Sequence, residues 1–460
     1  MFLLSEGSED TIPHILDLHS TLPTQVAFES KKEVVYYPKN SIEKDGPIIF
    51  KFVVPEDEMI DAFDMLLTLA VQILDQKSLI IERRRDGGTV SGAAPADNPK
   101  RFVLPVNGMN SSMFKSIEFK INGERVSASH SLYAHQANIE MRLSLPKSVK
   151  ESSLCLAGFY EERIAFDVLD AEQIKTLEGN SPIDKNLKRR LERAYEGRHI
   201  VTKGRLHTEM CDQTKLLPPN CHIDIKLTPQ DSKFYLLSKV ENEEYRARIL
   251  SSSLKVNHYK INPSINREIH DVTQTMVTRY PVRRVTMNYY TRTAGLTDLS
   301  DTLVITGVKP RRIVLALVNL QALHGDLTRD PYNYQHYNLR EAAVICDGTS
   351  YPTNPMTMNY GRQQYETPYY YLLKGTDSYL TDKDLGITLD NFAKRNCLYV
   401  FDLTSTGEPA ADAFELTRNV NIDIHLLTDT PTTENVAVLL YCEYDAEITI
   451  DSKLNVEYRK

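Results

Sequence analysis

Hydrophobic residues along this chain form short runs that are bounded by Gly, Pro, Asn or Asp. Ranges 46–54, 116–126, 222–228 and 435–445 are rich in Val, Ile, Tyr and Phe, as is typical of β-strands. The run at 311–319 is apolar almost throughout, which predicts a strand covered on both faces. The pattern therefore predicts a chain made mainly of strands in both of its halves.

Helical patterns are fewer and lie between the predicted strands. Ser131–Ser144 predicts one helix, and Ser181–Gly197 predicts another that begins with Ser-Pro and ends at Gly. The second helix carries a run of Lys and Arg that could bind an anion, and we interpret it as a solvated helix face. A third helical pattern starts at Ser264, between two strand-rich blocks, and is interpreted as an interdomain linker.

A weak internal repeat links the two halves. Asn220–Thr228 reads NCHIDIKLT and Asn419–Thr428 reads NVNIDIHLLT, so Ile223 and Ile422 lie 199 positions apart (422 − 223). The strand-like runs that open each half also share their order and spacing. This predicts two copies of one β domain of roughly 200 residues each, a size that suits a sandwich or a jelly roll.

Composition and charge exclude several classes of function. The 460 residues carry a net charge of −8, which argues against a protein that mainly neutralises phosphates. The basic and aromatic stretch Thr278–Arg292 fits a strand with one buried side at least as well as a surface that stacks nucleotides. Six cysteines lie far apart without a CxxC pair, so we expect reduced thiols in an intracellular compartment.

Segments that would target or span a membrane are not expected. The first twenty residues lack the basic region and the sustained apolar core of a signal peptide. No apolar run approaches the ~18 residues that a membrane helix needs.

Catalytic signatures are missing from the sequence, which holds no P-loop, no GxGxxG, no HExxH and no GxSxG. His324, Asp326 and Asp330 form the best metal-like cluster, but short loops with Asp and Gly are common turns. We therefore predict neither an enzyme nor a bound cofactor or metal.

Several stretches of the chain resemble a known family. These are Leu16–Ser30, Asp45–Phe50, Pro105–Glu140, Tyr280–Val285, Asn333–Leu339, Phe401–Thr404 and Glu443–Asp451. In this order they resemble the major capsid proteins of Polinton (Maverick) elements and the related adintoviruses. The likeness spans nearly the whole chain, although His135-Gln136-Ala137 departs from the Tyr-Arg-Ala that the family often has there.

The resemblance implies an all-β fold of two eight-stranded jelly rolls in tandem, a double jelly roll, with a few short inserted helices. Together with the repeat it predicts an N-terminal arm at 1–25, a first jelly roll at 26–263, a linker helix at 264–280 and a second jelly roll at 281–460. It also implies a structural protein of the virion, a homotrimer that forms a pseudohexameric capsomer of an icosahedral capsid around a DNA genome. Penton and minor capsid proteins would be its other partners, and assembly would occur in the host cell, by resemblance in the nucleus.

Long loops are the natural source of a trimer interface, and the candidates are 86–100, 319–339 and 353–371. Tyr332, Tyr334 and Tyr337 are predicted to contact a neighbouring chain, because Tyr supplies a large contact area together with a hydroxyl group. A carbohydrate-binding or host-attachment protein with jelly rolls is the alternative function. Sequence-specific nucleic-acid binding is disfavoured by the net charge and by an arm, 1–25, that has four acidic residues and no Lys or Arg.

Overall fold

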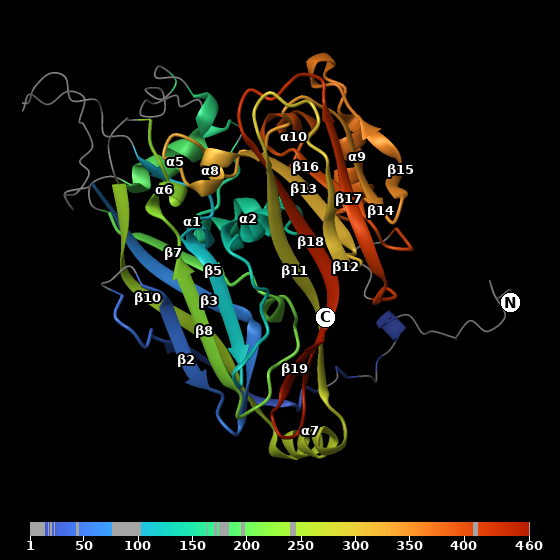
Figure 1. Cartoon of the computed structure of the whole chain (residues 1–460). Coiled ribbons are helices and arrows are strands. Elements are labelled where there is room, and N and C mark those ends of the chain that lie inside the picture. Colours follow the sequence, from blue (N-terminus) through green and yellow to red (C-terminus); the bar gives the residue numbers. More distant parts are fainter. Residues whose placement is uncertain are drawn as a thin grey trace, which may run out of the picture.

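The computed structural model describes residues 14–16, 18, 21–22, 24–42, 46–75, 103–162, 164–169, 173, 184–194, 198–239, 245–407 and 413–459. Most of the predicted arm and the predicted loop at 86–100 therefore lie outside the described residues. The described chain forms two β-sandwiches that lie side by side (Figure 1).

The first sandwich has two sheets of four antiparallel strands. One sheet has the order β1 (Phe28–Tyr36), β10 (Tyr245–Ile261), β3 (Glu58–Asp75) and β7 (Ile200–Arg205). The other has the order β2 (Ile48–Val53), β8 (His222–Pro229), β5 (Phe114–Ile121) and β6 (Glu124–Arg125). A short pair, β4 (Leu104–Pro105) with β9 (Leu236–Leu237), lies outside both sheets.

The second sandwich repeats this arrangement. One sheet has the order β11 (Thr278–Arg292), β18 (Val436–Ile450), β13 (Arg312–Asn319) and β16 (Leu398–Asp402), and β19 (Val456–Arg459) also pairs with β18. The facing sheet has the order β12 (Asp301–Val308), β17 (Asn419–Thr428), β14 (Leu339–Cys346) and β15 (Thr349–Thr357).

Both sandwiches have the strand order of a jelly roll. With the eight sheet strands of each sandwich counted along the chain, one sheet has the order first, eighth, third and sixth, and the other has second, seventh, fourth and fifth. The predicted fold class, two eight-stranded jelly rolls in tandem with a few short helices, is confirmed. β8 and β17 occupy the same seventh place, so Ile223 and Ile422 lie in equivalent strands, as the repeat predicted.

Short helices connect or cover the strands. They are α1 (Met109–Ser112), α2 (Tyr133–Leu143), α3 (Lys147–Glu151), α5 (Lys185–Ala194), α6 (Ser232–Tyr235), α7 (Pro263–Thr275), α8 (Leu320–His324), α9 (Glu366–Lys374) and α10 (Leu389–Arg395). Short 3₁₀ helices lie at His14–Leu16, Ser153–Ala157, Phe166–Val168, Glu209–Cys211 and Tyr360–Arg362. The predicted helix at 131–144 is α2. The prediction of a loop at 353–371 is wrong, because this range runs from β15 into α9.

Helix α7 joins the two jelly rolls at one end of the molecule, whereas α5, α8 and α10 lie at the other end (Figure 1). The side chain of Asn262 accepts a hydrogen bond from the Ser264 backbone N–H at 3.1 Å, and Pro263 occupies the first turn. None of the residues of α7 is buried. The helix therefore connects the rolls without packing between them.

The hydrophobic core continues from one jelly roll into the other. Phe50, Phe119 and Ile225 belong to the same cluster of buried side chains as Leu315 and Leu440. β13 is buried at all positions except its first, which confirms the prediction for 311–319. Burying one such Leu or Phe side chain stabilises the fold by about 1.5–3 kcal/mol, so a core shared by both rolls favours a fixed arrangement of the two.

Candidate functional site at the contact between the jelly rolls

Five charged residues are buried where the two jelly rolls meet, and we call them the inter-roll network: Arg142, Glu162, Arg190, Asp330 and Arg395. The carboxylate of Glu162 lies between two guanidinium groups, those of Arg190 on α5 and of Arg395 at the end of α10. Arg395 also contacts Asp330, with 3.3 Å between Nη2 and Oδ2. These four side chains are at most 1% exposed.

Each jelly roll contributes charges of both signs to this network. Arg142 on α2 donates hydrogen bonds to the Asn396 side chain and, at 3.1 Å, to the carbonyl oxygen of Tyr332. Burying an ion costs several kcal/mol, which only close opposite charges and hydrogen bonds can offset. Glu162 and Arg190 both belong to the first roll, whereas the contacts of Arg395 with Glu162 and of Arg142 with Asn396 and Tyr332 cross between the rolls. This second part of the compensation exists only when the two rolls are in contact.

Lys150 on α3 makes a further connection between the rolls. Its Nζ donates to the carbonyl oxygens of Arg142, at 2.5 Å, and of Leu385 in the second roll, at 2.7 Å. Burial lowers the pKa of Lys150 to about 8. The ammonium group therefore supports the end of α2, from which Arg142 enters the network.

A second pair of carboxylates lies beside the network. Asp167 in the first roll accepts hydrogen bonds from the Asp330 backbone N–H and, at 3.0 Å, from Nδ2 of Asn333. Burial, followed by the charge of Asp330, raises the pKa of Asp167 to about 6. The two N–H groups stabilise the charged form of Asp167 and so oppose the effect of burial and of Asp330.

The structure places two of the three predicted interface tyrosines inside the chain. Tyr332 and Tyr334 are 0% exposed, because α1 and α2 of the first roll cover them. The Tyr332 hydroxyl lies 2.6 Å from Oγ of Ser112, and the Tyr334 hydroxyl donates to Oδ1 of Asn138 at 3.3 Å. Neither side chain has exposed surface that a second chain could contact, and both connect the two rolls of one chain instead.

Tyr337 differs from the other two tyrosines, because it is only partly buried. Its hydroxyl donates to Oε1 of Glu434 at 2.7 Å. A contact between Tyr337 and a neighbouring chain stays a prediction.

Sequence reasoning missed the inter-roll network. Glu162 and Arg395 lie 233 residues apart, and neither belongs to a motif. The basic helix was predicted to be a solvated face, which is wrong for Arg190, whose side chain is 1% exposed. The only available signal was the excess of Arg in α5, which does not identify the residue that is buried.

The three residues of the predicted metal-like cluster, His324, Asp326 and Asp330, each contact different parts of the protein and do not form one site. The His324 ring packs against Tyr289 with 6.3 Å between ring centroids, and Asp326 accepts hydrogen bonds from Thr328. Asp330 belongs to the inter-roll network. Among the residues that the structure describes, no group of three or more His, Cys, Asp or Glu could hold a metal ion.

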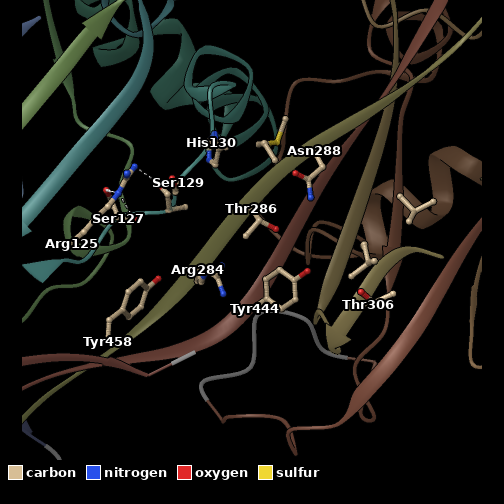
Figure 2. Close-up of a pocket in the computed structure, with 14 residues that line it drawn as sticks. Arg125, Ser127, Ser129, His130, Arg284, Thr286, Asn288, Thr306, Tyr444 and Tyr458 are labelled. Atoms are coloured by element: carbon tan, nitrogen blue, oxygen red, sulfur yellow. Dashed lines mark hydrogen bonds between the residues drawn. The ribbon is translucent and has the colours of Figure 1, made fainter.

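A cleft of about 510 Å³ opens between the jelly rolls away from the network (Figure 2). We call it the inter-roll cleft. β6 and the loop after it line it on the side of the first roll, and β11, β12, β18 and β19 line it on the side of the second. Its lining residues include two cations, Arg125 and Arg284, and no Asp or Glu.

Within the described part of the chain, no helix has the length and the apolar character needed to cross a membrane.

Comparisons with known proteins identify the fold. No family model matches the chain. An uncharacterized protein of Caenorhabditis elegans is 21% identical over 447 residues, which cover 94% of this chain and 98% of that protein. A full-length relative therefore exists in an animal, without a described function.

Three solved structures are similar over nearly their whole length. A chain in the cryo-EM structure of the Sputnik virophage has a TM-score of 0.62 at 10% identity, with 99% of this chain and 94% of that chain covered. The mavirus major capsid protein has a TM-score of 0.54 at 10% identity, with 99% and 96% covered. The faustovirus major capsid protein has a TM-score of 0.54 at 9% identity, with 94% and 92% covered. The chain thus shares its fold of two jelly rolls with viral major capsid proteins.

Proposed function

We propose that this chain is a viral major capsid protein, a structural subunit and not an enzyme. It would trimerise into pseudohexameric capsomers that build an icosahedral shell around a DNA genome. The observation that carries the proposal is the presence of two jelly rolls of identical strand order in one chain. They align with the mavirus and faustovirus major capsid proteins over at least 92% of each chain.

Symmetry supports a trimer of such chains. Three chains in a closed ring present six similar β-sandwiches, and such a ring has the shape of a hexagonal position in a capsid lattice. This requires that the two rolls of each chain keep one relative orientation. The continuous core and the buried inter-roll network provide that rigidity.

The N-terminal arm is proposed to be covered by a neighbouring chain. Ile15, Leu16, Leu18 and Leu22 are between 65% and 87% exposed. Large apolar side chains that are this exposed and lie close together in the sequence mark an interaction surface. We propose the division of the chain into the arm at 1–25 and the jelly rolls at 26–263 and 281–460. The linker helix, predicted at 264–280, is shorter, because α7 ends at Thr275 and β11 begins at Thr278.

The Polinton and adintovirus lineage is proposed as the origin of the chain, on the resemblance of its sequence motifs. A full-length relative in a nematode is consistent with an element that resides in animal genomes. The chain would function in the virion capsid, with assembly in the nucleus and with penton and minor capsid proteins as partners.

Light scattering on the purified protein tests the proposal. Three chains of 52.5 kDa give a particle of about 158 kDa, and electron microscopy should show a pseudohexagonal outline. Deletion of residues 1–20 should preserve the trimer and impair assembly of shells. A wild-type protein that is monomeric at micromolar concentration would contradict the capsid proposal.

A further inference from the structure

We propose that the inter-roll cleft binds an oxyanion of the phosphate class between Arg125 of the first jelly roll and Arg284 of the second. Figure 2 shows Arg125 beside Ser127 and Ser129 at one side of the cleft, and Arg284 on β11 beside Tyr444. The inference concerns a ligand site and goes beyond the proposed role in a capsid.

Arg125 is held in place by neutral acceptors only. Its Nε donates to the carbonyl oxygen of Ser127 at 3.2 Å, and its Nη2 donates to the carbonyl oxygens of Ala128 at 2.7 Å and of Ile117 at 3.3 Å. Within the described part of the chain, no carboxylate forms an ion pair with it. The guanidinium group is thus fixed at the cleft without a direct carboxylate partner, although Glu118 lies near enough to interact with it electrostatically.

Arg284 has still fewer partners. Its guanidinium carbon lies 5.8 Å from the centre of the Tyr444 ring, and its Nε is buried without a hydrogen-bond acceptor. In the described residues no hydrogen bond or ion pair compensates its charge. A buried donor without an acceptor is unfavourable, and an oxyanion at the terminal nitrogens would compensate the charge of the whole guanidinium group.

The other arginines of β11 have carboxylate partners, so the lack of a partner is specific to Arg284 and not general to the strand. Arg279 lies 3.3 Å from Glu447, Arg292 lies 3.3 Å from Asp301, and Arg283 pairs with Asp445. Among the described residues, Arg284 alone of the four arginines of β11 has no carboxylate partner. The strand places this one cation toward the cleft.

The walls of the cleft suit an oxyanion. Hydroxyl groups that could donate hydrogen bonds belong to Ser129, Thr286, Thr306 and Tyr444, whereas the Tyr458 hydroxyl interacts with Glu209. The acidic group behind the loop is Glu209, whose Oε1 accepts a hydrogen bond from the Ala128 backbone N–H at 2.9 Å. Burial raises the pKa of Glu209 to about 8, so this residue does not neutralise the cleft at pH 7.

Guanidinium groups match phosphate in geometry as well as in charge. The two arginines belong to different jelly rolls, so a shared anion would add a connection between the rolls. A volume of about 510 Å³ accommodates pyrophosphate as well as phosphate.

Calorimetric titration of the full-length protein with phosphate and with pyrophosphate, at constant ionic strength in chloride, tests the site. We expect saturable binding to the wild-type protein and at least a tenfold loss of affinity in Arg284→Gln. Arg279→Gln is the matched control on the same strand, outside the cleft, and should bind like the wild type. Absence of binding to the wild type, or equal binding to Arg284→Gln, overturns the proposal.

A second variant keeps the test decisive if Arg284→Gln does not fold. Thr306 is exposed at the rim of the cleft, so Thr306→Asp adds a carboxylate without removing a buried group. We expect this variant to remain folded and to lose affinity at least tenfold, because its carboxylate competes for the arginines. Unchanged affinity in Thr306→Asp would place the bound anion elsewhere and overturn the assignment.

Discussion

At the scale of single residues, Glu162 has the largest predicted effect on stability. Glu162→Gln removes the negative charge between Arg190 and Arg395 and leaves two guanidinium groups without their main counter-charge. Breaking a buried ion pair on one side costs about 3–5 kcal/mol, and urea denaturation should show a loss of this size. The control is Asp390→Asn, whose exposed pair with Lys394 contributes less than about 1 kcal/mol. Similar losses in the two variants would contradict a structural role of the network.

His135 makes a second prediction at this scale, on the dependence of stability on pH. Burial lowers the pKa of His135 to about 3, and its Nε2 has no hydrogen-bond partner. The unfolded chain takes up this proton near pH 6.5 and the folded chain does not, so stability is lost as the pH falls below 6.5. His135→Phe retains the packing against Phe234 and Tyr332 and removes this titration.

Denaturation at pH 7 and at pH 5 measures the effect of His135→Phe. Between these values the wild type should lose about 2 kcal/mol more than the variant, from ~1.4 kcal/mol per pH unit below pH 6.5. Other titrating groups cancel in the comparison because both proteins contain them. Equal pH dependence in the two proteins would show that folding does not change the pKa of His135.

At the scale of elements, the equivalence of β8 and β17 predicts that the same substitution in either strand lowers the stability of the protein by a similar amount. Ile223 and Ile422 are each at most 1% exposed and lie between two neighbouring strands of their sheets. Ile223→Ala and Ile422→Ala should each destabilise the protein by about 2–5 kcal/mol. The exposed control variants His222→Ala and Asn421→Ala should stay within about 0.5 kcal/mol of the wild type. A large difference between the two Ile variants would argue against equivalent positions.

Hydrophobic periodicity predicted most of these elements, because strands such as β2, β8 and β17 bury every second residue and β13 is covered on both faces. It could not predict details that depend on distant neighbours. Tyr289 continues the alternation of the buried Val285 and Met287, yet it is 41% exposed, because β11 is the outermost strand of its sheet. The cap of α7 is Asn262 and not Ser264, since both residue types suit this position.

At the scale of the whole molecule, the repeat predicted two copies of one fold but not how the copies contact each other. That contact depends on pairs such as Glu162 with Arg395, which have no periodicity and lie far apart in sequence. The predicted interface tyrosines show the same limit. Composition indicated that Tyr332 and Tyr334 lie in a contact, but it could not distinguish a contact within the chain from one between chains.

The contact also predicts how the two rolls behave once the chain between them is cut. Helix α7 has no buried residue, and Ile269 and Val272 in it are 41% and 56% exposed, so a protease site within 266–272 should not disturb the fold. After cleavage we expect the two rolls to co-elute in size-exclusion chromatography and to unfold in one thermal transition, because the core and the network cross the contact. Cleavage of the same protein carrying Glu162→Gln should weaken this association. Separation of the wild-type rolls after cleavage would show that α7, and not the buried contact, holds them together.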